Sequence, residues 1–141
     1  MKRVFFLLSL LPLAAGAADP ASDLAPAQTD YFNKKILPVL KQRCYECHSH
    51  EAAKIKGGLV VDSRDGLLKG GDTGPAVVPQ KLDDSLLITS VRWDDPDFQM
   101  PPKEKLPDAE IKLFEEWVKM GAPDPRATPA GVGNQQMIAA K

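Results

Sequence analysis

Both cysteines of the 141-residue chain lie in one pentapeptide, Cys44-Tyr45-Glu46-Cys47-His48. Two thiols at this spacing can form thioether bonds with the two vinyl groups on one edge of a haem. The residue that follows then brings an imidazole nitrogen to the iron, and histidine is a common axial ligand of haem iron. The motif therefore predicts one covalent haem c per chain, with Cys44 and Cys47 as attachment residues and His48 as an iron ligand.

Three other kinds of site use cysteines in similar patterns. A thioredoxin-like redox pair needs a strand before the motif, whereas here a helical pattern precedes it and a polar loop follows. A structural zinc site could use both cysteines together with His48 and His50, but such sites usually draw on two separated ligand pairs. A disulfide would close a very short loop and stabilise the fold little. These stay open as alternatives, and the sequence favours haem attachment.

A second axial ligand must come from elsewhere in the chain, and Met100 is the best candidate. It precedes Pro101-Pro102, and a proline forces the residue before it into extended geometry, so its thioether would be displayed from a stiff loop. Met120, at the end of a predicted helix, and Met137, near the C-terminus, are weaker candidates. Ligation by His48 and a methionine would raise the reduction potential relative to two histidines.

A helix is predicted before the motif and another near the end of the folded part. The first follows Asp30 as its N-cap, is bent or cut short by Pro38, and has three apolar side chains on one face: Phe32, Ile36 and Leu40. The last has acidic residues in its first turn, at positions 108 and 110, and is ended by glycine and proline at 121 and 123. Its buried stripe is formed by Ile111, Phe114, Trp117 and Val118.

Two shorter helices are predicted between them. One covers residues 62–69 and ends at Gly70-Gly71, and the other follows Asp83 or Asp84 and continues to Val91. No convincing strand pair appears, apart from a doubtful strand at 59–61. The predicted fold class is therefore all-α with long loops.

The N-terminus has the pattern of a signal peptide. Lys2 and Arg3 precede an apolar run at 4–13, and Ala15-Gly16-Ala17 supplies the small residues of a cleavage site. The apolar run is shorter than the roughly 20 residues that span a bilayer, so a cleaved signal is favoured over an uncleaved membrane anchor. We therefore expect export to the periplasm and no stable insertion in the membrane.

The remaining chain divides by composition into three parts. Residues 18–28 are expected to form a flexible lead-in, residues 29–123 a single folded domain, and residues 124–141 a disordered tail. Removal of residues 1–17 leaves 16 basic and 19 acidic side chains, a net charge of −3. This near-neutral balance gives no reason to expect nucleic acid as a partner.

Short motifs from residue 36 to residue 123 resemble those of the planctomycete-type cytochrome c domain. They are Ile36-Leu37-Pro38, the cysteine motif at 44–48, Gly57-Gly58-Leu59, Asp62-Ser63-Arg64, the run 70–75, Val78-Pro79, Met100-Pro101-Pro102 and the run 115–123. The resemblance implies a small class I-like cytochrome c fold wrapped around one covalent haem. It also implies that Cys44, Cys47, His48 and Met100 have the roles described above. Such domains often begin much longer proteins, and this chain departs from that pattern.

The resemblance suggests further residues around the haem. Thr73-Gly74-Pro75 is similar to the Thr-Gly-Pro of class I cytochromes, in which the proline carbonyl accepts a hydrogen bond from the proximal histidine. A simple turn is an equal alternative for these residues. Arg64, Arg92 and Trp93 are candidate donors to the haem propionates, and an ordinary surface or core position is an equal alternative for each of them.

The function expected from these features is single-electron transfer to and from redox partner proteins, with both axial ligands staying on the iron. No nucleophile and base are paired in the sequence, so we do not expect an enzyme. The first alternative is the haem subunit of a periplasmic dehydrogenase. The second is a sensor or peroxidase with an open iron site, if Met100 does not bind the iron firmly.

Overall fold

The computed structural model describes residues 24–126. The predicted signal peptide at 1–17 and most of the predicted tail lie outside the described residues. The elements, in chain order, are α1 (Pro26–Tyr31), the π-helical segment η1 (Phe32–Ile36), α2 (Leu37–Arg43), α3 (Tyr45–His48), η2 (Lys56–Gly58), α4 (Arg64–Lys69), α5 (Leu86–Arg92), η3 (Pro96–Phe98) and α6 (Asp108–Lys119).

The described part of the chain is all-α, which confirms the predicted class. Residues 24–126 contain two isolated β-bridges, Gly71 with Gly74 and Val78 with Lys81, and no named strand. The doubtful strand at 59–61 is a loop. No helix among the described residues is long and apolar enough to cross a membrane.

The helix before the cysteine motif is longer than predicted. It begins at Pro26, inside the expected lead-in, and Asp30 lies within it, where it accepts a 2.6 Å hydrogen bond from Lys34 Nζ. Pro38 has no N–H to donate one turn back, and the chain turns more widely just before it, so that Leu37 N–H bonds to the Phe32 carbonyl. A π-helical segment therefore takes the place of the predicted bend.

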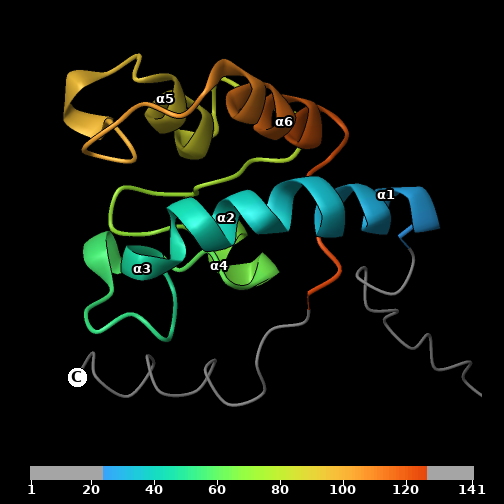
Figure 1. Ribbon diagram of the computed structural model, residues 1–141, viewed down its shortest axis with the longest axis horizontal. Coiled ribbons are helices and arrows are strands. Elements are labelled where there is room, and N and C mark those ends of the chain that lie inside the picture. The colour runs from blue at the N-terminus through green and yellow to red at the C-terminus, as the bar shows by residue number, and fades with distance from the viewer. Residues whose placement is uncertain (1–23, 127–141) are drawn as a thin grey trace, which may run out of the picture.

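The core forms where this rod meets α6. Phe32 and Ile36 of η1 and Leu40 of α2 have no exposed surface. The Phe32 and Trp117 ring centroids lie 5.9 Å apart, and Phe114 meets Trp117 edge-on at 6.5 Å. In Figure 1 the rod from α1 to α2 runs across the molecule, with α5 and α6 on one side and α3 and α4 on the other. The predicted apolar faces of the first and last helices thus pack against one another.

The two middle helices begin slightly later than predicted. Ser63 is the N-cap of α4, and its hydroxyl accepts a hydrogen bond from the Gly66 N–H. Gly70, at φ +73° and ψ −161°, ends α4 as expected. Ser85 precedes α5, and its buried hydroxyl donates to the carbonyl of Lys81 at 2.6 Å.

Candidate functional site

The cysteine motif forms one helical turn at the end of α2. The N–H groups of Cys47 and His48 both donate to the Cys44 carbonyl, at 3.1 and 2.9 Å. Side chains three and four residues apart lie on the same face of a helix, so both thiols and the imidazole share one side of the turn. Ser49 closes the turn, because its hydroxyl donates to the Tyr45 carbonyl at 2.7 Å. We call residues 44–48 the attachment turn.

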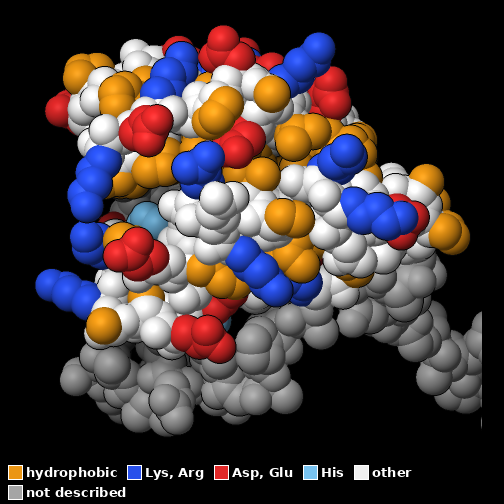
Figure 2. Space-filling view, viewed as in Figure 1, with side chains coloured by type: hydrophobic (Ala, Val, Ile, Leu, Met, Phe, Trp, Pro, Cys, Tyr) orange, Lys and Arg blue, Asp and Glu red, His pale blue; other side chains and the backbone are white. Residues whose placement is uncertain are grey.

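The attachment turn forms part of the wall of a cavity of about 330 Å³. Figure 2 shows a hollow in the surface beside a histidine side chain. Much of the lining is apolar, so the cavity suits a large apolar group. The apolar lining includes Leu59, Val61, Ala76, Leu86, Leu87, Val91, Phe98 and Leu106.

Met100 lines the same cavity, from the loop after η3. Its N–H donates to the Ser90 carbonyl at 3.0 Å, and its own carbonyl accepts from Trp93 Nε1 at 3.3 Å. The backbone at this position is therefore attached to the end of α5. The Met100 side chain is 41% exposed. Met120, the weaker candidate, does not line the cavity.

His48 carries the polar atom that stands out in the site. Its Nδ1 atom is buried. Among the described residues, it is the only buried side-chain nitrogen or oxygen that lacks a hydrogen-bond partner. An unsatisfied buried polar group costs about 1–3 kcal/mol, so it needs an explanation. His48 also lines the cavity, so its imidazole is available to bind a cofactor there.

Comparison with known proteins identifies the cavity-forming segment. Residues 44–104 match the family model described as planctomycete cytochrome C. This part of the chain is similar to the planctomycete cytochrome c family. No curated protein and no solved structure matches the chain. The matched segment begins at the attachment turn and includes Met100, whereas α6 lies beyond it.

The residues present fit the covalent haem of a planctomycete cytochrome c. Two unbridged thiols and an imidazole with an unsatisfied nitrogen stand on one wall of a largely apolar cavity that also receives a thioether. His48 would bind the iron from the attachment turn. Met100, which also lines the cavity, is the residue that the sequence predicted as the second axial ligand.

Pro75 does not take the place that the family resemblance suggested. It is exposed and does not line the cavity, although Thr73 and Gly74 do. No hydrogen bond joins its carbonyl to His48, because His48 Nδ1 has no partner among the described residues. The run 70–75 instead forms a tight turn in which the Gly71 N–H donates to the Gly74 carbonyl at 3.2 Å. This geometry matches the simple-turn alternative.

The basic residues of the cavity are different from those predicted. Arg43 and Lys56 line it, whereas Arg64, Arg92 and Trp93 do not. Arg92 pairs with Glu115 on α6, and the Trp93 indole donates to the Met100 carbonyl. Adjacency to the motif was the signal that could have indicated Arg43, since it directly precedes Cys44.

The electrostatic surroundings of the attachment turn keep Cys44 protonated. Burial, followed by the nearby charge of Glu110, raises the pKa of the Cys44 thiol to about 12, and Arg43 opposes this effect. Arg43 forms an ion pair with this carboxylate, because its Nε and Nη2 atoms each lie 3.3 Å from a Glu110 oxygen. Cys44 is thus a neutral, partly exposed thiol in the wall of the cavity.

His50 is engaged away from the cysteines. Its Nδ1 lies 2.8 Å from Asp62 Oδ1, and its backbone N–H donates to Asp62 Oδ2 at 2.6 Å. Residues 24–126 contain no group of three or more His, Cys, Asp or Glu side chains arranged to hold a metal ion. The zinc alternative required His50 to join Cys44 and Cys47, and the structure does not bring them together in this way.

Proposed function

We propose that the protein is a periplasmic monohaem c-type cytochrome that carries single electrons and is not an enzyme. Haem would be bonded to Cys44 and Cys47, with His48 and Met100 as the iron ligands. The observation that supports this proposal is the convergence of these four side chains, from two distant parts of the chain, on one largely apolar cavity. The match of residues 44–104 to the planctomycete cytochrome C model supports the cytochrome class.

Each part of the cavity has a separate task in this proposal. The haem, when bound, supplies one-electron chemistry between two oxidation states of iron. The apolar lining excludes water, and the exclusion of solvent is one of the ways in which a protein sets a reduction potential. Arg43 and Lys56 are the lining cations available to pair with acidic groups of the cofactor.

Export and partner choice are also part of the proposal. The N-terminal pattern at 1–17 supports secretion into the compartment where c-type haem is attached. We infer that the partners are redox proteins. This chain either docks with them briefly as a free carrier or is the haem subunit of a periplasmic dehydrogenase.

One observation favours a second candidate function. Met100 lies in a loop and not in a helix, and its relative exposure as a residue is 41%. If this ligand dissociates readily, the iron would have an open position, as a gas sensor or peroxidase requires.

The test uses the full chain exported and loaded with haem in a host that attaches c-type haem. Intact mass should equal the mature chain plus one haem that survives acidic organic extraction. Reduced protein should bind carbon monoxide slowly or not at all, and peroxide turnover should not exceed that of free haem. Haem that is lost on extraction would overturn covalent attachment. Rapid stoichiometric binding of carbon monoxide would replace the carrier with the open-site alternative.

A further inference from the structure

The three residues that follow Pro123 are tightly held, although the sequence placed them in a disordered tail. Asp124 is 1% exposed, and the Arg126 side chain is 15% exposed. Arg126 Nε donates to Asp124 Oδ1 at 2.9 Å, and Arg126 Nη2 also donates to the same carboxylate. The planar guanidinium thus donates two hydrogen bonds to a buried carboxylate two residues away, a geometry that arginine provides and lysine does not.

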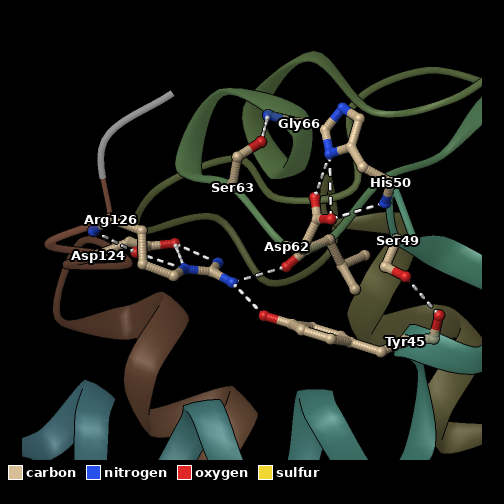
Figure 3. Close-up of polar contacts among 9 residues, drawn as sticks. Tyr45, Ser49, His50, Asp62, Ser63, Gly66, Asp124 and Arg126 are labelled. Atoms are coloured by element: carbon tan, nitrogen blue, oxygen red, sulfur yellow. Dashed lines mark hydrogen bonds and ion pairs between the residues drawn. The ribbon is translucent and has the colours of Figure 1, made fainter. Parts of the chain in front are cut away.

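The other side of this guanidinium reaches the attachment turn, 81 residues earlier. Figure 3 shows Arg126 between Asp124 and Tyr45. Arg126 Nη1 donates to the Tyr45 hydroxyl at 2.8 Å and to the Val61 carbonyl at 2.9 Å. The guanidinium carbon also lies 4.7 Å from the centroid of the Phe32 ring, within cation–π range.

Both acceptors lead directly to the cavity. Tyr45 is the residue between Cys44 and Glu46 in the attachment turn. Val61 lines the cavity, and its N–H donates to the His48 carbonyl at 2.8 Å. One cation therefore holds the attachment turn at Tyr45 and, through Val61, at His48. We call Asp124 and Arg126 the C-terminal clasp.

The charge of the clasp is balanced locally. Burial acts to lower the pKa of Arg126, but the hydrogen bonds and charge of Asp124, with a contribution from Tyr45, raise it overall. The guanidinium therefore stays charged and keeps the N–H groups that it donates to Tyr45 and Val61. Loss of one member of a buried ion pair leaves the other charge uncompensated, so the two residues act as a unit.

We propose that Arg126, oriented by Asp124, is a positioning residue that sets the orientation of His48 in the attachment turn through Tyr45 and Val61. The proposal rests on haem ligation by His48 as put forward above. Residues that orient an axial ligand fix the direction of its ring and the electronic state of the metal. The clasp is formed by protein groups alone, so it orders the turn before as well as after haem is attached.

The first test removes one hydroxyl from each of two comparable tyrosines in the haem-loaded full chain. Tyr45→Phe deletes the acceptor of Arg126 in the attachment turn. Tyr31→Phe is the matched control, because the Tyr31 hydroxyl donates to Leu113 and Glu116 on α6 and touches no residue of the turn. The electron paramagnetic resonance signal of ferric haem, which depends on axial ligand orientation, is recorded well below the unfolding temperature. We expect a shifted or additional low-spin signal in Tyr45→Phe and the wild-type signal in Tyr31→Phe.

The second test breaks the clasp itself. Arg126→Met alone would leave the Asp124 carboxylate buried and unpaired, so the chain could fail to fold, and the double variant Asp124→Asn/Arg126→Met avoids this charge. We expect it to reproduce the altered signal of Tyr45→Phe and to bind carbon monoxide about tenfold faster than the wild type when reduced.

The outcomes separate this inference from the proposed function. If wild-type protein carries haem and both Tyr45→Phe and the double variant give the wild-type signal, with equal carbon monoxide rates, the clasp does not position His48. A lower unfolding temperature without a change in the signal would mean that the clasp only stabilises the fold, which also overturns the proposal. Wild-type protein without covalent haem would instead refute the proposed function.

Discussion

Met100 is the site residue for which a single substitution is most informative. Its backbone N–H and carbonyl bond to Ser90 and Trp93, so replacement of the side chain by alanine leaves the loop attached to α5. We expect the oxidised Met100→Ala protein to lose the weak red absorption band that arises from sulfur-to-iron charge transfer. Visible spectroscopy of the purified protein measures this directly.

Met120→Ala is the matched control for this prediction. Its side chain has a similar exposure, 37% against 41%, but it does not line the cavity. We expect this variant to keep the band. A band that persists in Met100→Ala and disappears in Met120→Ala would transfer the ligand role to Met120.

At the scale of the elements, the end of α4 depends on one glycine. Gly70 has a backbone conformation that is essentially restricted to glycine, and an added Cβ would lie 1.8 Å from the Gly74 carbonyl oxygen. Gly57 also has a positive φ, of +60°, but an added Cβ there would have nothing within 4 Å. The two positions therefore separate backbone strain from steric overlap.

We expect Gly57→Ala to cost about 1–2 kcal/mol of unfolding free energy, the usual penalty for an L-residue in the left-handed region. Gly70→Ala should cost clearly more, because it adds a clash with backbone. Denaturant unfolding of both variants, with the wild type as reference, measures the difference. Equal losses in the two variants would show that the turn at 70–75 relaxes to accept a side chain.

The junction between α1 and α6 should be sensitive to alkaline pH. The Tyr31 hydroxyl lies 3.1 Å from Glu116 Oε2 and donates to the Leu113 carbonyl at 3.3 Å. Burial, followed by the hydrogen bond and the charge of Glu116, raises the pKa of Tyr31 to about 12. Between pH 10 and 12 the unfolded chain releases this proton while the folded chain retains it. Stability must therefore fall as pH rises through this window.

Tyr31→Phe should remove this contribution to the pH dependence. We expect the variant to be less stable than the wild type at neutral pH, since the hydrogen bonds are lost, and its unfolding free energy to decline less between pH 10 and 12. Unfolding by denaturant at a series of pH values gives both quantities. Parallel curves for the two proteins would mean that Tyr31 titrates normally in the folded state.

At the scale of the whole molecule, net charge should decide how electron exchange responds to salt. The cavity lining carries two basic residues, Arg43 and Lys56, and two acidic residues, Asp72 and Asp97, so neither sign of charge dominates in the lining. The mature chain expected after cleavage has a net charge of −3. Exchange with a small cationic redox complex should therefore slow as ionic strength rises, and exchange with an anionic complex should accelerate.

Stopped-flow mixing with the two complexes at several salt concentrations measures these rates. The anionic complex is the control, because any general effect of salt on the protein would change both rates in the same direction. The opposite pattern would indicate a basic contact region around the site of electron exchange.

Features that depend on residues close together in the chain could be predicted from the sequence. The spacing of Cys44, Cys47 and His48 is a local property, because one helical turn brings positions i, i+3 and i+4 to the same side. The stripe on α6 predicted the buried residues Ile111, Phe114, Trp117 and Val118, since the helical period identifies the apolar face. The all-α class followed from the same periodicity and is confirmed. The axial role of Met100 remains a prediction, although the structure places this residue in the cavity lining.

Contacts between residues from distant segments could not be predicted from the sequence and became known from the folded chain. Arg43 and Lys56 reach the cavity while Arg64 and Arg92 do not, because this depends on how the helices cross. The contact of Arg126 with Tyr45 has no local signal either, since the residues after Pro123 have the composition of a tail. These residues are ordered because the chain after α6 passes the Tyr45 hydroxyl and the Val61 carbonyl. The Arg126 guanidinium, paired with Asp124, donates hydrogen bonds to both groups. A composition pattern reports flexibility, whereas a hydrogen-bond partner 81 positions away becomes apparent only in the folded chain.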